Sequence, residues 1–189
     1  MGNFVPALIG LPFGIAGVAW ILHAREVFSP GLALVVACPI VTWWAVNVMG
    51  LFENDAMRRE SDARLKARGG DKPSERHFVG FARPSYAGLL DPHEDVGFLF
   101  VYPDRIEFLG EKHDLSLTRS QVKGVRFRRS VHSWVGLGRW VSVEGEIEGK
   151  PVRLLVEPRE MGTLRANRRF GARLRERLES WLADVPASE

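Results

Sequence analysis

Hydrophobic and polar positions divide the chain into two unlike parts. Two long apolar runs cover residues 4–22 and 31–52, and neither contains Asp, Glu, Lys or Arg. A helix needs about 20 predominantly apolar residues to cross the roughly 30 Å hydrocarbon core of a bilayer. The pattern therefore predicts a transmembrane helical hairpin over residues 1–52.

Positive charges follow the second run but hardly occur between the two runs. Arg25 is the one Lys or Arg in the connector, whereas residues 53–76 contain seven of them. Short segments rich in Lys and Arg stay on the cytoplasmic side of a membrane. We therefore expect a multi-pass protein of the plasma (inner) membrane with both termini in the cytoplasm.

Small residues recur within the runs at spacings that let helix backbones approach closely. They are Gly10, Gly14, Gly17, Ala33 and Ala37. We interpret them as the packing seam of the hairpin, with a dimerisation face as the alternative. Pro12, deep in the first run, is expected to leave a backbone carbonyl without its helical partner. The turn residues Ser29-Pro30-Gly31 predict the start of the second helix.

The polar stretch after the second run predicts a connecting segment over residues 53–76. Alternating charges in residues 53–68 are typical of a solvated juxtamembrane helix, and the composition of residues 69–74 is that of a linker.

Beyond residue 76 the pattern changes to short alternating segments, which predict strands. These lie at residues 77–83, 95–102, 105–109, 114–117, 122–128, 140–147 and 152–156. After Pro158 the period becomes helical, and one apolar stripe joins Leu164, Gly171, Leu174, Leu178, Trp181 and Leu182. The predicted class is α+β: an N-terminal transmembrane α-hairpin, then a small antiparallel β-barrel or sandwich of about seven strands at residues 77–189, capped by a C-terminal helix.

This order of seven strands and a capping helix, with VGFLFVYPDRIEFLGE followed by LSLTRSQVKGVRFR, resembles a pleckstrin-homology-like (PH-like) domain of the bacterial or GRAM type. The resemblance covers residues 77–185 and implies a PH-like fold with a binding role. It implies no particular ligand residues, because the phosphoinositide pocket of eukaryotic PH domains has no counterpart that we locate in this sequence. A different small β-barrel or sandwich is the alternative fold.

Charge adds one candidate site. Residues 119–139 contain basic side chains and no carboxylate, and basic surfaces attract anionic lipid. The candidates for lipid or anion contact are Lys123, Arg126, Arg128, Arg129 and Arg139. Trp134 and Leu137, in a loop with glycines, are candidates for membrane insertion. The alternative is that these two apolar residues close one end of the barrel and the arginines are merely solvated.

Other function classes find little support. The formal net charge is only +3, and Glu144, Glu146 and Glu148 lie near the basic segment, so we expect no nucleic-acid partner. The histidines lack metal-ligand spacing, the single Cys38 excludes an intramolecular disulfide, and no phosphate-binding glycine loop or nucleophile elbow is found. We therefore expect no enzyme, no metal and no cofactor.

Together these patterns predict a membrane-anchored cytoplasmic PH-like binding module. We expect it to recruit a protein partner, with anionic inner-leaflet phospholipid as a further contact. The alternative is a small accessory subunit of a membrane complex. Its transmembrane helices would then make the main interaction, and its β domain would act as a regulatory cap.

Overall fold

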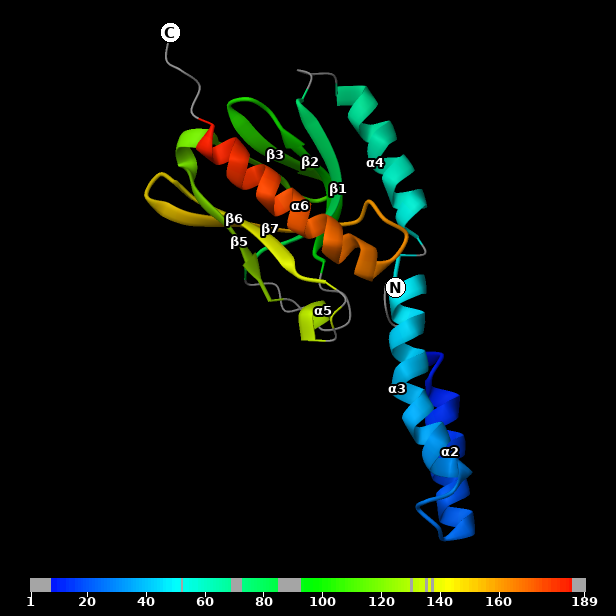
Figure 1. The fold of residues 1–189 in the computed structure, drawn as a ribbon. Coiled ribbons are helices and arrows are strands. Elements are labelled where there is room, and N and C mark those ends of the chain that lie inside the picture. The colour runs from blue at the N-terminus through cyan, green and yellow to red at the C-terminus, as the bar shows by residue number, and fades with distance from the viewer. Residues whose placement is uncertain are drawn as a thin grey trace. The chain divides into compact units, whose positions relative to one another are not determined.

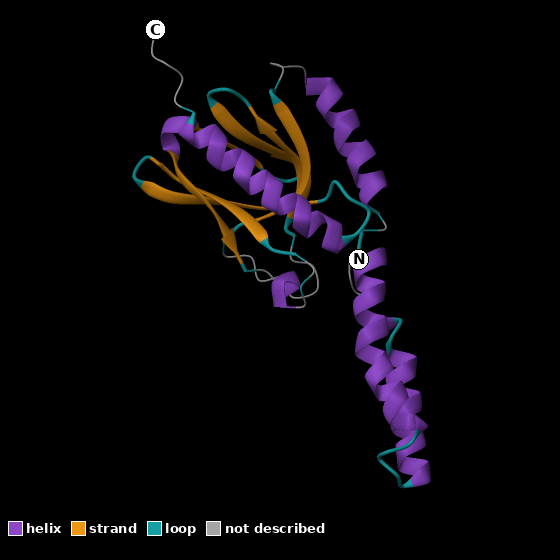
Figure 2. Ribbon diagram, in the orientation of Figure 1, coloured by secondary structure: helices purple, strands orange, loops and turns teal. Residues whose placement is uncertain are grey.

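A computed structural model describes residues 8–51, 53–68, 73–84, 93–129, 131–134, 136 and 138–184, with backbone only at 66–68, 131 and 132. The chain divides into two compact units, Met1–Phe52 and Glu53–Glu189. The first is helical and the second combines helices with a β-sheet (Figures 1 and 2). The α+β class is thereby confirmed.

The first unit is an antiparallel pair of helices, α2 (Leu11–Ala24) and α3 (Pro30–Met49). A Cβ atom added at Gly10 would lie 2.0 Å from Thr42 Oγ1, and one at Gly17 would lie 2.6 Å from the Gly31 carbonyl oxygen. Early residues of α2 therefore meet late residues of α3. Glycine at these positions lets the two backbones come this close.

The other predicted packing residues divide between the two helices. Gly14 faces Cys38, since a Cβ atom added there would lie 3.1 Å from Cys38 Sγ. Ala33 is exposed and Ala37 half-buried, and neither is among the nearest neighbours of Gly10, Gly14 or Gly17.

The helix starts are governed by proline. α3 begins at Pro30 after Ser29, as predicted. Pro12 falls in the first turn of α2, which begins at Leu11 after the turn residues 9 and 10. A first-turn residue has no intrahelical acceptor for its N–H, so proline removes no hydrogen bond there.

The apolar helices differ in length. By length and composition, one helical stretch of the described residues, which begins at Pro30, is long and apolar enough to cross a membrane, with a mean hydropathy of 2.0. At 14 residues, α2 is shorter than a full span. Residues 4–7 of the predicted first span and Phe52 of the second lie outside the described residues.

The second unit is built on one antiparallel sheet with strand order β4-β3-β2-β1-β7-β6-β5. The strands are β1 (Glu75–Ala82), β2 (Asp95–Val101), β3 (Arg105–Gly110), β4 (Asp114–Thr118), β5 (Val122–Arg128), β6 (Trp140–Ile147) and β7 (Lys150–Pro158). The seven predicted strands are confirmed to within two residues at each end. A 3₁₀ turn, η1 (Arg119–Gln121), joins the edge strands β4 and β5, and the short helix α5 (Val131–Trp134) lies between β5 and β6.

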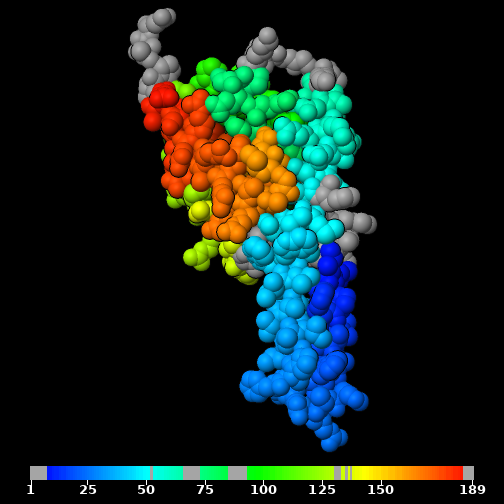
Figure 3. Space-filling model, turned by 45° about the vertical axis from the view of Figure 1, so that its right-hand side comes forward, coloured from blue at the N-terminus to red at the C-terminus, as the bar shows by residue number. Residues whose placement is uncertain are grey.

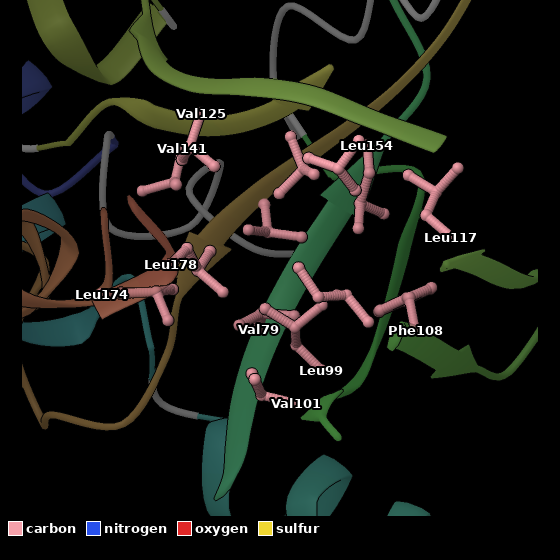
Figure 4. Packing of buried hydrophobic residues seen from close by; sticks show 14 of the residues in the cluster. Val79, Leu99, Val101, Phe108, Leu117, Val125, Val141, Leu154, Leu174 and Leu178 are labelled. Carbon is pink, nitrogen blue, oxygen red and sulfur yellow. The ribbon is translucent and has the colours of Figure 1, made fainter. Parts of the chain in front are cut away.

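The main core lies between the inner face of this sheet and the C-terminal helix α6 (Leu164–Ala183). Figure 4 shows Leu174 and Leu178 of α6 pointing toward the same space as Val79, Leu99 and other side chains of the sheet. The predicted stripe of α6 is buried apart from Leu182, which is half-buried, and the opposite side of the helix lies on the surface (Figure 3). Thr163 caps this helix by accepting a hydrogen bond from the Ala166 N–H at 3.2 Å.

The predicted helix at residues 53–68 is present as α4 (Asn54–Arg68), but it covers part of the outer face of the sheet, so the expectation that it is solvated is wrong for the side that carries Met57 and Leu65. Its Met57 and Leu65 pack against four buried aromatic residues of β1, β2 and the following turn: Phe78, Phe98, Phe100 and Tyr102. Asn54 is buried and donates a hydrogen bond to the carbonyl of Arg159. Arg58 forms an ion pair with Glu160 at 2.8 Å. This helix is therefore a structural part of the β unit.

Candidate functional site

The outer face of β5, β6 and β7 carries charged side chains. Val125, Val143 and Leu154 belong to the core, and successive side chains of a strand point to opposite faces. Their neighbours on the outer face are Arg126 and Arg128 on β5, Ser142 and Glu144 on β6, and Arg153 on β7. The register pairs Glu144 with Gly124 of β5 on one side and with Arg153 of β7 on the other. Arginines of both flanking strands therefore reach this glutamate.

These arginines converge on a single carboxylate. Arg128 donates hydrogen bonds from Nε and Nη2 to Glu144 Oε1, at 3.0 and 2.5 Å. Arg126 Nε lies 3.0 Å from Oε2, and Arg153 Nε lies 3.4 Å from Oε1. Ser142, which is buried, donates from its hydroxyl to Oε1 at 3.3 Å. We call Arg126, Arg128 and Arg153, with Glu144 between them, the arginine cluster.

The charge of the cluster is positive. Burial raises the pKa of Glu144, but hydrogen bonding by Arg128 and the positive charges of Arg128, Arg126 and Arg153 outweigh burial, so its pKa is lowered. Glu144 is therefore ionised at neutral pH, and three guanidinium groups with one carboxylate leave a net charge of +2. The Glu144 side chain is only 16% exposed, whereas that of Arg126 is 60% exposed. The exposed part of the arginine cluster is thus mainly cationic.

The remaining basic candidates, Lys123, Arg129 and Arg139, are not members of the arginine cluster. Arg139 places its guanidinium 4.1 Å from the ring centroid of Phe127, and Arg175 of α6 lies 4.9 Å from the same centroid. Arg139 therefore supports the packing of β5. Lys123, beside a register shift in β5, and Arg129, after the strand, are exposed.

Trp134 is the one exposed large apolar side chain in the described part of Glu53–Glu189, at 79% exposure. It is the last residue of α5, and a ring this exposed is not packed against the end of the sheet. Arg168 of α6 donates from Nη1 to the carbonyl of Gly136 at 2.8 Å, which ties the segment after Trp134 to the core helix. Leu137, the second insertion candidate, lies outside the described residues.

Two members of the cluster, Glu144 and Arg153, are absent from the sequence-based candidates. The carboxylate belongs to the next strand, so its relation to the arginines depends on strand pairing. Predicted alternation on residues 140–147 did place Glu144 opposite the core residues Val141 and Val143. The alternation therefore indicates that Glu144 faces away from the core. Only the pairing of β6 with β5 and β7 shows that the arginines lie beside it.

A buried polar pair, His93 and Glu157, also lies on the outer face of the sheet. His93 Nε2 lies 3.1 Å from Glu157 Oε2, and the two side chains are 6% and 5% exposed. The His93 ring meets Trp140 edge-on, with centroids 5.2 Å apart. Among the described residues, no group of three or more His, Cys, Asp or Glu side chains is arranged to hold a metal ion.

No protein-family model and no curated protein matches the chain. Its function is therefore inferred from the arginine cluster, from Trp134 and from the apolar helices.

Proposed function

We propose that this protein is a membrane-anchored PH-like binding module that docks on the anionic inner leaflet through Trp134 and the basic side of β5. The observation that carries the proposal is the exposure of Trp134 next to a strand whose outer face is cationic. Tryptophan favours the membrane–water interface, where its apolar ring and its N–H group are both accommodated.

The charges nearby suit an anionic surface. Each Lys or Arg close to such a surface contributes about 1 kcal/mol of attraction. Lys123 and Arg129 are exposed, and the arginine cluster adds its net charge of +2. The combined attraction is about 4 kcal/mol. It is screened within about 10 Å at an ionic strength of about 0.1 M.

The apolar helices support anchoring. α3 ends at Met49 and α4 begins at Asn54, so only residues 50–53 separate the apolar helix from the β unit. A connector of this length reaches at most about 17 Å. A weak interaction with the leaflet then becomes an intramolecular one at high effective concentration.

Orientation follows from the basic residues after the second apolar run, which favour a cytoplasmic β unit. With the first apolar run as the other span of the proposal, both termini lie in the cytoplasm. A reporter fused after Glu189 tests this arrangement. One that works only in the cytoplasm is expected to be active, and activity of a reporter that works only outside the cytoplasm would refute the orientation.

Docking itself is tested by tryptophan fluorescence of the full-length protein in nanodiscs made with brominated acyl chains. The difference between the wild-type protein and Trp134→Phe isolates the emission of Trp134. We expect this emission to be blue-shifted and quenched when the nanodisc contains phosphatidylserine. The matched control is Trp20→Phe, whose difference signal comes from the apolar hairpin and should not depend on phosphatidylserine.

The double variant Arg126→Glu/Arg128→Glu should lose the lipid-dependent quenching of Trp134, because it reverses the charge of the adjoining strand. Trp134 emission that stays unquenched at every phosphatidylserine content would overturn the lipid proposal. That result would leave an acidic protein surface as the occupant of this face.

A further inference from the structure

The arginine cluster holds more hydrogen-bond donors than Glu144 can use. Three guanidinium groups carry about fifteen N–H donors, whereas a carboxylate offers about four lone-pair sites. Arg126 and Arg153 both approach Glu144 with Nε, and both side chains are well exposed, at 60% and 41%. Most of the donors therefore remain for a second anion.

The charge of the cluster selects among anions. Its net charge of +2 matches a phosphomonoester, which carries about −1.5 to −2 near neutral pH. A phosphodiester carries a single negative charge and leaves the cluster under-neutralised. Guanidinium groups also bind phosphate oxygens in a bidentate manner, which adds geometric selectivity to the charge.

Glu144 gives the cluster its geometry. Three like charges on neighbouring strands repel one another, and the carboxylate between them holds all three at 2.5 to 3.4 Å. Its own position is fixed on β6 by the hydroxyl of Ser142. Binding groups that are oriented in advance by supporting side chains on strands lose little entropy when a ligand arrives.

We infer that the arginine cluster is a binding site for a phosphomonoester group, and that Glu144 is the positioning residue that holds Arg126, Arg128 and Arg153 for it. The inference rests on the proposed function in that it names the ligand class of the same surface. Binding of the phosphate does not, however, require Trp134 to enter the bilayer.

The test follows the arginine Nε–H signals in NMR spectra of the full-length protein in nanodiscs. One arm uses neutral nanodiscs titrated with inorganic phosphate at constant ionic strength. A second arm uses nanodiscs that contain phosphatidic acid, a lipid phosphomonoester. A third arm uses phosphatidylserine at the same total lipid charge. We expect the cluster signals to shift with phosphate and with phosphatidic acid, and far less with phosphatidylserine.

The first two arms distinguish the source of the ligand. A response to both assigns the site to a lipid headgroup, and a response to inorganic phosphate alone assigns it to a soluble phosphomonoester. A response that follows total lipid charge, with no preference for phosphatidic acid and none to inorganic phosphate, overturns the inference.

A matched pair of conservative substitutions tests the geometry. Arg153→Lys keeps the charge but removes the planar fork, and it should weaken phosphomonoester binding by about tenfold. Arg169→Lys changes an exposed arginine of α6, outside both the cluster and the basic side of β5, and should leave binding unchanged. Equal affinities of the two variants would refute the site.

Glu144→Gln separates positioning from simple charge. The substitution raises the net charge of the cluster from +2 to +3, so diffuse electrostatics predicts tighter binding of every anion. A positioning role predicts weaker phosphomonoester binding together with stronger binding to phosphatidylserine. A parallel gain for both anions would exclude the positioning role.

The two proposals can fail separately. If the wild-type protein binds phosphate but Trp134 is not quenched by lipid, the docking proposal alone is refuted. If Trp134 is quenched but the cluster does not bind phosphate, only this inference is refuted.

Discussion

Replacement of Asp95 by alanine should destabilise the β unit more than any surface substitution. Asp95 begins β2, and its side chain is 1% exposed. Its carboxylate accepts hydrogen bonds from the backbone N–H groups of Glu111, Lys112 and His113 at 3.1, 2.9 and 2.8 Å. These three residues form the turn between β3 and β4, so one side chain of β2 fixes the hairpin next to it.

The size of the effect follows from these contacts. Each hydrogen bond to a charged group contributes about 1.5 to 3 kcal/mol. Glu111 and Lys112 are exposed, so water replaces part of what their N–H groups lose. The net cost of Asp95→Ala is then about 3 kcal/mol. For a unit of this size it lowers the melting temperature by about 10 °C.

The assay is thermal unfolding of the full-length protein in detergent, followed by near-ultraviolet circular dichroism. The control is Asp104→Ala, in the turn between β2 and β3, where the carboxylate is 71% exposed and lies 3.4 Å from Arg105 Nη1. This control should change stability by less than about 0.5 kcal/mol. If the two variants melt within a few degrees of each other, Asp95 does not organise the hairpin.

Two further predictions concern acid stability and the helical hairpin. Hydrogen bonding by Arg83 lowers the pKa of Glu94, and the arginine cluster lowers that of Glu144 despite its burial, both from an ordinary 4.5. The stability that these groups contribute is therefore complete above pH 4.5 and is lost as the pH falls through their lowered pKa values. Urea unfolding should show a smaller pH dependence in Glu94→Gln/Glu144→Gln than in the wild-type protein. An unchanged pH dependence would show that neither group contributes to acid stability. Gly17→Leu should lower resistance of the hairpin to unfolding by sodium dodecyl sulfate, because even a Cβ atom there lies 2.6 Å from a carbonyl oxygen of α3; wild-type resistance would contradict that packing.

Most of the β unit could be predicted because its local patterns agree with its packing. In β6, Val141 and Val143 enter the core while Ser142 and Glu144 point outward, as the alternation of the sequence indicates. The stripe of α6 is similarly unambiguous, although Asn167 is also buried and makes hydrogen bonds to the turn before the helix. In both elements the positions that are apolar in the sequence are the ones that pack in the core.

The docking of α4 was missed because its own apolar face is weak. Met57 and Leu65 are its large apolar residues that meet the sheet, and alternating charges dominate the remainder. The stronger signal lay in β2, which is apolar on both faces. A strand of that kind needs a covering layer on each side, and α6 can cover only one of them.

The docked helix also matters for the proposed function. With α4 held on the sheet, only residues 50–53 connect the apolar helix to the β unit. With α4 detached, the connection would extend to Glu75 and would include a helix of 15 residues, which adds about 22 Å before the linker is counted. Effective concentration falls with about the −3/2 power of tether length, so lengthening the reach from about 17 to about 39 Å would lower the concentration of the cluster at the proposed docking surface by about threefold. The contacts that Asn54, Met57 and Leu65 make with the β unit would therefore favour the proposed docking by keeping the connector short.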